Sequence, residues 1–290
     1  MKRVLVTGAG GALGRELLGV LRAQGWQIRA LHWAEAGALP PAEKGVEWVA
    51  GDVRHAEYLE ELMADCQAVL HLAAVILTAN PQLYEEVNAA GTQNVVRAAE
   101  RVGLEHLILV SSISVEYPQA TLYAQSKMRA EAAVRASAVP WTIVRPTLLS
   151  GSGGGAEYHL FARLAKLPVV FLPLAGRARK RPISVAALAR GLGQILAQPA
   201  GSVGKTYALA GAEILTLKQI LSQIAQEHGH RSPLVLRFPV FLGNIFTRIL
   251  DLWPFRKFSW YQAWRGLCTD AAPSIAPAQQ DFGYDPNENS

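Results

Sequence analysis

Cysteine is scarce in this sequence, because Cys66 and Cys268 are the only two among 290 residues. They lie far apart and without a metal-ligand spacing, which excludes a disulfide-stapled scaffold and leads us to expect no metal. No apolar run reaches the ~18 residues of a membrane span. The apolar run after Arg3 is too short for a signal peptide, so we expect a protein of the cytoplasm.

The sequence also lacks a large excess of either charge. It contains 28 Lys and Arg and 23 Asp and Glu, which gives a net charge of +5. A surplus this small does not predict nucleic-acid binding, and no RNA-binding motif accompanies it. Half of the residues are apolar and 18% are charged, which is typical of a globular protein. We expect one large domain, or a domain with a smaller appendage, and a small-molecule substrate.

Up to about residue 145, short apolar runs alternate with longer stretches that have helical spacing, a pattern that predicts an α/β fold with a parallel sheet. The first run is Val4 to Thr7, and the helix after it ends at Gly25. Further strands are expected at 28–32, 46–50, 68–72, 106–110 and 141–144, and helices around 56–64, 82–102 and 122–137.

Beyond Pro146 the pattern changes to a glycine-rich stretch at 151–155 and a basic run at 177–181, which we interpret as a long functional loop region. Ser184 is placed to cap a helix to about residue 198, and a strand is expected at 207–210. Thr216 and Gln219 form a capping box for a helix to about residue 228.

The segment Thr7-Gly8-Ala9-Gly10-Gly11-Ala12-Leu13-Gly14 joins the first strand to the first helix. Glycine is needed there where a side chain would block a tight turn, the approach of a pyrophosphate or the packing of the helix. Backbone N–H groups at the helix start then receive the phosphates. The loop predicts dinucleotide binding; a plain strand-to-helix turn is the alternative.

The residues for the adenosine end are less distinctive. His32 and Trp33 stand where an acidic residue would favour NAD, and this absence of a carboxylate slightly favours NADP, although Arg29 and His32 are weak phosphate clamps. Asp52, followed by Val53, could accept a hydrogen bond from the adenine amino group. Alternatively, Asp52 caps the helix that follows.

Tyr123 and Lys127 are four residues apart on a predicted helix and so share one face. The ammonium of Lys127 and a positive nicotinamide would stabilise a Tyr123 phenolate. Ser112 follows a strand at the ligand-binding edge of the sheet, so it could hold a substrate oxygen while Tyr123 exchanges its proton and a hydride is transferred. The alternative is an ordinary surface pair.

Together these motifs resemble the extended or atypical short-chain dehydrogenase/reductase superfamily, whose pattern also matches His71-Leu72-Ala73-Ala74, Asn88 with Gly91-Thr92, and Arg145-Pro146-Thr147. The resemblance implies a doubly wound Rossmann sheet with a small C-terminal substrate lobe, and a homodimer is a family-level expectation. It implies that Ala73 and Ala74 line the cofactor channel and that Lys127 also contacts the nicotinamide ribose. The cofactor residues we expect are Thr7, Gly8, Gly10, Gly11, Ala12, Leu13, Gly14, His32, Trp33, Asp52, Val53, Leu72, Ala73, Ala74, Asn88, Val110, Tyr123, Lys127, Pro146 and Thr147.

We therefore expect residues 1–150 to bind NAD(P) and carry the catalytic groups, and residues 151–290 to form mainly the substrate lobe, with elements that return to the sheet. The favoured reaction is that of a nucleotide-sugar epimerase or dehydratase, with Arg179 and Arg181 clamping a diphosphate unless that run is simply solvated. Reduction or oxidation of an apolar alcohol or ketone is one alternative. A non-catalytic dinucleotide sensor resembling the NmrA-like proteins is another.

The stretch 238–264 interleaves aromatic and basic residues. Core packing under the substrate lobe is the favoured interpretation. A substrate lid, a dimer surface and an element that touches a membrane surface remain open.

Overall fold

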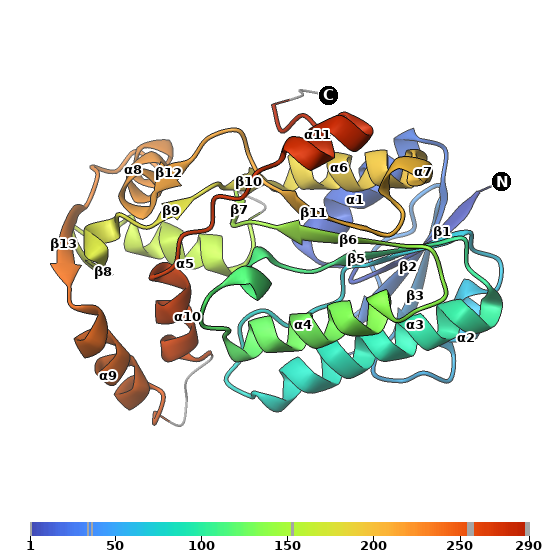
Figure 1. The fold of residues 1–290 in the computed structure, drawn as a ribbon, viewed down its shortest axis with the longest axis horizontal. Coiled ribbons are helices and arrows are strands. Elements are labelled where there is room, and N and C mark those ends of the chain that lie inside the picture. Colours follow the sequence, from blue (N-terminus) through green and yellow to red (C-terminus); the bar gives the residue numbers. More distant parts are fainter. Residues whose placement is uncertain (1, 34, 36, 152–153, 254–257, 288–290) are drawn as a thin grey trace.

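A parallel sheet runs through the computed structural model, which describes residues 2–33, 35, 37–151, 154–253 and 258–287 (Figure 1). Within these residues the sheet has seven strands in the order β11-β6-β5-β4-β1-β2-β3. This is the strand order of a doubly wound nucleotide-binding sheet, with one further strand at the β11 edge. The strands are β1 (Arg3–Thr7), β2 (Gln27–Trp33), β3 (Val46–Gly51), β4 (Ala68–His71), β5 (His106–Val110), β6 (Trp141–Pro146) and β11 (Lys205–Leu209).

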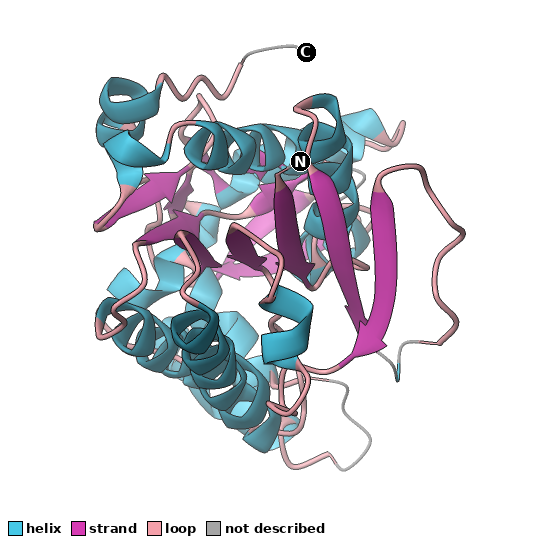
Figure 2. Cartoon of the chain, turned by 90° about the vertical axis from the view of Figure 1, so that its right-hand side faces the viewer, coloured by secondary structure: helices cyan, strands magenta, loops and turns pink. Residues whose placement is uncertain are grey.

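Helices cover both faces of this sheet, as the three layers in Figure 2 show. One face carries α1 (Ala12–Ala23) and α6 (Val185–Ala197), which pack against each other. The other face carries α2 (Leu59–Met63), α3 (Gly91–Val102) and α4 (Leu122–Arg135). The short helices α7 (Pro199–Ser202) and α11 (Ala276–Phe282) lie at the β11 edge. The predicted α/β fold class is confirmed.

The sequence explains these elements locally. Every residue of β4 and β5 is buried, as expected of strands covered on both faces. Helix α1 buries Leu17, Leu18 and Leu21 on one side. The Ser184 side chain accepts a hydrogen bond from Ala187 N at the start of α6, so that predicted cap is confirmed.

Two predicted helices have different bounds in the structure. The stretch 82–102 begins as a π-helical segment, η2 (Tyr84–Ala90), and only then continues as α3. Spacing of apolar residues does not separate a π from an α turn. The helix expected at 56–64 is shorter, because Tyr58 turns its hydroxyl back to the backbone of Asp52 and only residues 59–63 are helical.

The rest of the chain forms a lobe beyond the carboxyl ends of the strands (Figure 1). It is not the long loop region predicted from 151 onward, because α5, β8 and β9 fall within that stretch and a core around Phe161, Leu172 and Leu221 holds them. The predicted capping box of Thr216 and Gln219 is confirmed. The lobe consists of β7 (Leu149–Ser150), α5 (Ala156–Leu164), β8 (Val169–Pro173), η4 (Leu174–Gly176), β9 (Arg179–Lys180), β10 (Ile183–Ser184), β12 (Leu215–Thr216), α8 (Leu217–Glu227), β13 (Leu234–Phe238), α9 (Val240–Leu250) and α10 (Trp260–Leu267).

The lobe strands form three small pairs, in which β10 pairs with β7, β12 with β9, and β13 with β8. Residues of α5 and α10 line a cavity together with residues at the carboxyl ends of the central strands, whereas η4 packs on β8, β13 and α8. None of the helices in the described residues is both long enough and apolar enough to cross a bilayer.

Candidate active site

A cavity of about 630 Å³ lies between the carboxyl ends of the central strands and the lobe. This is the position where open α/β sheets bind ligands. It brings together most of the site residues predicted from the sequence. Those that line it are Gly8, Gly11, Ala12, Leu13, Gly14, Trp33, Asp52, Val53, Leu72, Ala73, Ala74, Val110, Ser112, Tyr123, Pro146 and Thr147.

The glycine loop has the shape that a dinucleotide phosphate needs. Gly8 has φ = +70°, and a Cβ there would lie 2.8 Å from the backbone nitrogen of Ala73. A Cβ on Gly14 would lie 2.5 Å from the carbonyl oxygen of Ala9, so any side chain would push α1 off the loop. Gly11 caps α1 without a side chain, and the helix start at Ala12 and Leu13 lines the cavity. The loop therefore fits a pyrophosphate on the helix N-terminus.

Beneath this loop, a buried hydrogen-bond network fixes the neighbouring strand. Thr7 Oγ1 accepts from the backbone N–H groups of Leu72 and Ala73, both at 3.2 Å, so its own proton goes to His71 Nδ1 at 2.7 Å. His71 Nε2 then donates to Thr92 Oγ1 at 3.0 Å. Burial, and secondarily the charge of Lys127, lowers the pKa of His71 to about 3, so the ring stays neutral. Thr7 thus holds the cavity wall in place and does not itself line it.

Besides Thr7, four predicted cofactor residues lie outside the cavity lining: Gly10, His32, Asn88 and Lys127. His32 is buried directly beneath Gly10, where a Cβ would lie 2.6 Å from its Nδ1. It therefore supports the glycine loop, and the structure gives no support to His32 as an adenosine contact. Asn88 is fully buried, and its side chain bonds both backbone groups of Val75 at 2.8 and 2.9 Å.

The adenosine end of the cavity holds two charged residues that the sequence analysis missed. Arg54 and Glu35 line it together with Trp33 and Asp52. The Arg54 guanidinium donates to Asp52 at 2.6 and 2.8 Å and to Glu35 at 3.1 Å. Burial alone would raise the pKa of the Asp52 carboxyl, but the hydrogen bonds from Arg54 hold it below its ordinary value. The sequence did carry a signal for Arg54 as an adenosine-end residue, because it lies only two residues after Asp52 and just beyond the end of β3.

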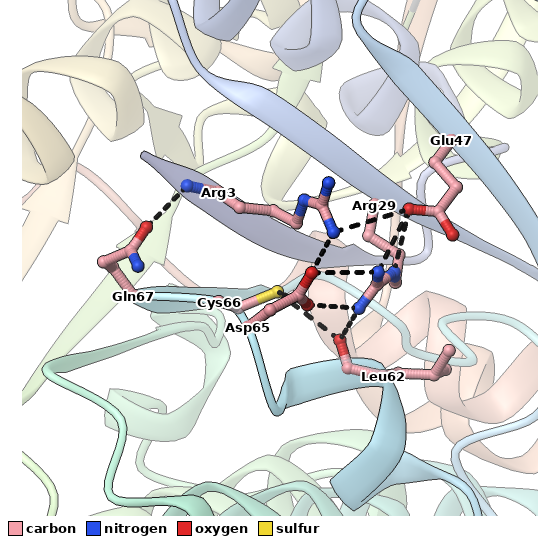
Figure 3. Close-up of polar contacts among 7 residues, drawn as sticks. All are labelled: Arg3, Arg29, Glu47, Leu62, Asp65, Cys66 and Gln67. Atoms are coloured by element: carbon pink, nitrogen blue, oxygen red, sulfur yellow. Dashed lines mark hydrogen bonds and ion pairs between the residues drawn. The ribbon is translucent and has the colours of Figure 1, made fainter. Parts of the chain in front are cut away.

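Arg29, considered as a phosphate clamp from the sequence, is committed elsewhere. Figure 3 shows its guanidinium between Asp65 and Glu47, with Arg3 beside it. The Nη1 atom donates to Asp65 at 2.7 Å and to the carbonyl oxygen of Leu62 at 2.8 Å. Arg29 also donates to Glu47 of β3 at 3.1 Å, so it links β2 to β3 and to the end of α2, and it does not line the cavity.

Tyr123 and Ser112 both line the cavity, from the first turn of α4 and the end of β5. Ser112 Oγ accepts from Ser114 N at 3.2 Å and lies 2.9 Å from Ser114 Oγ, so its position is fixed by the short helix η3 (Ile113–Glu116). Tyr123 also packs against Tyr84, with ring centroids 6.1 Å apart.

Lys127 stands one helical turn after Tyr123 and is almost fully buried. Its Nζ donates to the carbonyl oxygen of Val110 at 2.8 Å, next to the strand end that carries Ser112. Burial lowers the pKa of Lys127 to about 8, and the nearby Glu131 carboxylate limits that fall. The ammonium is therefore still mostly charged at neutral pH, close behind the cavity wall.

Helix α4 is fixed from below by Glu131, which is 2% exposed. Glu131 accepts from Ser111 Oγ at 2.6 Å and from Arg145 at 2.6 and 2.8 Å. Burial would raise the pKa of Glu131, but the hydrogen bonds from Arg145 and Ser111 keep it below its ordinary value. These bonds tie the helix of Tyr123 to the strands β5 and β6.

The substrate end of the cavity differs from the sequence prediction. Arg179 and Arg181 do not line it. The Arg181 guanidinium donates to the carbonyl oxygens of Gly211, Pro273 and Ala212, and Arg179 pairs with Asp270 at the surface, where both side chains are more than half exposed. The structure therefore does not support a diphosphate clamp at these two residues.

The walls at this end are largely apolar. Leu160 and Phe161 of α5 and Ala263 and Leu267 of α10 line the cavity, which Ser112 and Tyr123 also line. Lys180 lines it too, and its Nζ donates to the carbonyl oxygens of Gly266 and Thr269 at 2.9 and 2.7 Å. Helix α10 falls largely within the stretch 238–264, for which a substrate lid was one open interpretation. The sequence alone could not show that it lines this cavity, because its residues lie more than 130 positions from Tyr123.

Residues 8–199 match the family described as NAD(P)H-binding. The chain belongs to this NAD(P)H-binding family. The match includes the glycine loop from Gly8 onward and all three of Ser112, Tyr123 and Lys127.

Two relatives of the NAD(P)H-binding chain are reductases. A ceramide reductase of Caulobacter vibrioides is 34% identical over 167 residues, which cover 58% of this chain and 52% of the relative. The chain thus aligns with only about half the length of that protein. A 2-alkyl-3-oxoalkanoate reductase of Stenotrophomonas maltophilia is 29% identical, with 98% of this chain and 94% of the relative covered.

Among solved structures, the dTDP-glucose 4,6-dehydratase DesIV of Streptomyces venezuelae, with NAD and TYD bound, superimposes with a TM-score of 0.78. The identity is 19%, and 99% of this chain and 92% of the other are covered, so the likeness shows the fold. The family match and the reductases among the relatives confirm the resemblance to the short-chain dehydrogenase/reductase superfamily and the prediction of an NAD(P)-dependent enzyme of that type.

Proposed function

We propose that this protein is an NAD(P)H-dependent reductase, or dehydrogenase in the reverse direction, that acts on a carbonyl group attached to an apolar chain. The observation that carries the proposal is the combination of Tyr123 and Ser112 on one wall of the cavity with apolar side chains of α5 and α10 on the other.

A bound nicotinamide would supply or accept the hydride. Ser112 Oγ would donate a hydrogen bond to the substrate carbonyl oxygen and so orient it. Tyr123 Oη would give its proton to that oxygen as negative charge develops there. Lys127 would lower the cost of the phenolate that remains, because its ammonium lies one helical turn away and is charged below a pH of about 8.

The apolar class of substrate is supported by what the far wall offers and by the named relatives. Leu160, Phe161 and Leu267 would contact a hydrocarbon chain but give a nucleotide diphosphate no hydrogen bonds. The relatives from Caulobacter vibrioides and Stenotrophomonas maltophilia carry names with a ceramide and a 2-alkyl-3-oxoalkanoate as substrates.

The test is oxidation of NADPH and NADH, followed by absorbance, in the presence of a medium-chain 3-oxo ester, with a short-chain homologue as comparison. We expect turnover that increases with chain length and falls about 10²–10⁴-fold in Tyr123→Phe, since general acid catalysis contributes that much. Cofactor affinity should change little. Equal rates for Tyr123→Phe and the parent protein would overturn the catalytic assignment.

The nucleotide-sugar and sensor hypotheses give different results with the same protein. Interconversion of a UDP-sugar without net change in NAD(P)H would favour the epimerase prediction made from the sequence. Binding of NAD(P)H without turnover of either substrate class would favour a sensor.

Choice of cofactor is part of the proposal. Arg54 would bind a 2′-phosphate of NADP, because its guanidinium lines the adenosine end of the cavity. Glu35, which shares that guanidinium, would oppose the phosphate. The balance between these two residues, in place of His32, is our revised basis for a modest NADP preference.

A further inference from the structure

Helix α9 has its side chains arranged in the reverse of a normal surface helix. Its buried residues are Gly243 and Thr247. Its large apolar side chains face outward: Phe241 is 65% exposed, Ile245 55% and Ile249 59%. Spacing of four residues puts these three on one stripe, and Leu242 and Phe246 extend it.

The inward face explains why the helix stays in place. Gly243 lies so close to the indole of Trp264 that a Cβ could not be accommodated, so α9 packs tightly on α10 through small residues. Thr247 Oγ1 donates back to the carbonyl oxygen of Gly243 at 2.6 Å, so the buried threonine hydroxyl is satisfied within the helix, whereas the buried Trp264 Nε1 and Asn244 Oδ1 have no hydrogen-bond partner among the described residues. The outward stripe is therefore not left exposed by a helix that could simply rotate.

The apolar surface continues beyond the helix. Leu234 and Leu236 of β13 and Phe171 of β8 are exposed, and Leu252 and Trp253 follow the end of α9 at 80% and 66% exposure. Half of the exposed large apolar side chains in the described part of the chain lie between residues 234 and 260. Figure 1 shows β8, β13 and α9 together at the end of the molecule remote from the central sheet. Patches of this kind mark interaction surfaces.

The net positive charge of the chain lies in a segment that includes this apolar surface. Residues 229–269 contain six Lys and Arg and one acidic residue, Asp251, a net charge of +5. The rest of the chain has 22 of each sign, so this segment carries the whole net charge. Within it, Arg237 and Arg248 are exposed on β13 and α9. Asp251 is bonded to Ser259 and the backbone of Trp260.

We propose that this α9 surface, comprising Phe241, Ile245, Ile249, Leu252, Trp253 and the neighbouring Arg248, docks on an anionic lipid bilayer. A helix with an apolar face, aromatic residues and flanking cations lies in the interface of a membrane without crossing it. Basic residues next to it gain from the negative surface potential of anionic lipids. A protein partner would need a matching acidic surface, whereas an anionic bilayer satisfies both the apolar and the positive character.

The test is flotation of the full chain with vesicles of phosphatidylcholine, with or without about 30% phosphatidylglycerol. We expect binding to the anionic vesicles that weakens at high salt. The variant Phe241→Ser/Ile245→Ser/Ile249→Ser should bind about tenfold more weakly or worse, because apolar area is lost from the contact. The matched control, Leu39→Ser/Val203→Ser/Ile214→Ser, removes exposed apolar side chains elsewhere and should bind within about twofold of the parent.

A second pair of variants isolates charge. Arg237→Gln/Arg248→Gln should weaken binding to the anionic vesicles about 30-fold, since each cation near the surface contributes about fivefold to the attraction. The control variant Arg97→Gln/Lys44→Gln, which changes two exposed cations outside segment 229–269, should bind the anionic vesicles as tightly as the parent protein. NADH affinity, measured by calorimetry for each variant, checks that the fold is intact and is independent of the proposed reaction.

Three outcomes would overturn the proposal. The first is failure of the parent protein to float with anionic vesicles. The second is equal binding by the α9 variant and the parent. The third is a dimer in light scattering that dissociates in the α9 variant, without vesicle binding, which would assign the surface to a second copy of the chain.

Discussion

Helices α1 and α9 are similar in length and both rich in apolar residues, yet they face opposite ways. Helix α1 buries Leu17, Leu18 and Leu21 against the sheet and exposes Arg15 and Glu16. Helix α9 buries Gly243 and Thr247 and exposes Phe241, Ile245 and Ile249. Folding alone accounts for α1, because burial of its leucines stabilises the native state. It does not account for α9, whose large apolar side chains Phe241, Ile245 and Ile249 are more than half exposed.

The same contrast holds for charge between the sheet half and the lobe. The Glu131–Arg145 pair of the sheet half is buried, with 2% and 19% of the side chains exposed, whereas the Arg179–Asp270 pair of the lobe is 66% and 58% exposed. Burial makes the first pair a requirement of the fold, and water weakens the second. The Glu131–Arg145 pair thus belongs to the scaffold, whereas Arg179–Asp270, like exposed pairs of the sheet half such as Arg129–Glu85, presents its charges to water.

The largest expected effect tests this difference in charge. Glu131→Gln should reduce the free energy of unfolding by about 3–5 kcal/mol, because the largely buried Arg145 then faces a neutral amide and keeps only the half-exposed Glu116 as an ion partner. Asp270→Asn in the lobe should cost less than about 1 kcal/mol. Urea denaturation of both variants checks the pair, and similar losses for the two would remove the contrast.

The next effect tests the helices directly. Leu17→Ala should cost about 2–5 kcal/mol through the cavity it leaves in the core. Ile245→Ala should stay within about 0.5 kcal/mol, as for other exposed positions. Thermal unfolding at matched conditions measures both. A large loss for Ile245→Ala would mean that α9 contributes to the core after all and would remove the reason to seek a partner for it.

A smaller effect concerns the buried ammonium of the sheet half. Burial lowers the pKa of Lys127 from 10.5 to about 8, so its charge destabilises the fold. That cost is fully present below pH 8, where both folded and unfolded states are protonated, and disappears as pH rises to 10.5. The stability of Lys127→Met relative to the parent should therefore be highest below pH 8 and decline toward pH 10.5. A difference that does not vary with pH would contradict a buried, perturbed Lys127.

The smallest effect is expected at the exposed rim of the sheet half. Arg54→Gln should weaken NADPH about tenfold and NADH much less, because a guanidinium is the preferred partner of a 2′-phosphate. Glu35→Gln should shift the preference the other way. Calorimetric titration of each variant with NADH and NADPH measures this preference. A parallel loss of NADH and NADPH affinity in Arg54→Gln would rule out a role of Arg54 in cofactor specificity.

Much of the fold and of the catalytic wall could be predicted because the signals are local. The glycines at 8, 11 and 14 sit between a strand and a helix, and the spacing of Tyr123 and Lys127 puts them on one face of α4. The exceptions depend on contacts across the fold. His32 has the right sequence position for adenosine, but its ring turns under Gly10. Arg181 belongs to a basic run, but three backbone carbonyl groups hold its guanidinium.

The sequence by itself determined the order of strands and helices up to about residue 146, the phosphate loop and the position of Tyr123 and Lys127 on one face of α4, because each rests on neighbours within one or two turns. Core packing was the favoured interpretation of residues 238–264, and for α9 it is wrong: the large apolar side chains face outward. Phe255, Arg256 and Lys257, included in that interpretation, lie outside the described residues. Only the tertiary structure decided which face of α9 is covered, which cations reach the cavity and that α10 closes it. Periodicity defines a face, but the face is buried only if another element packs on it.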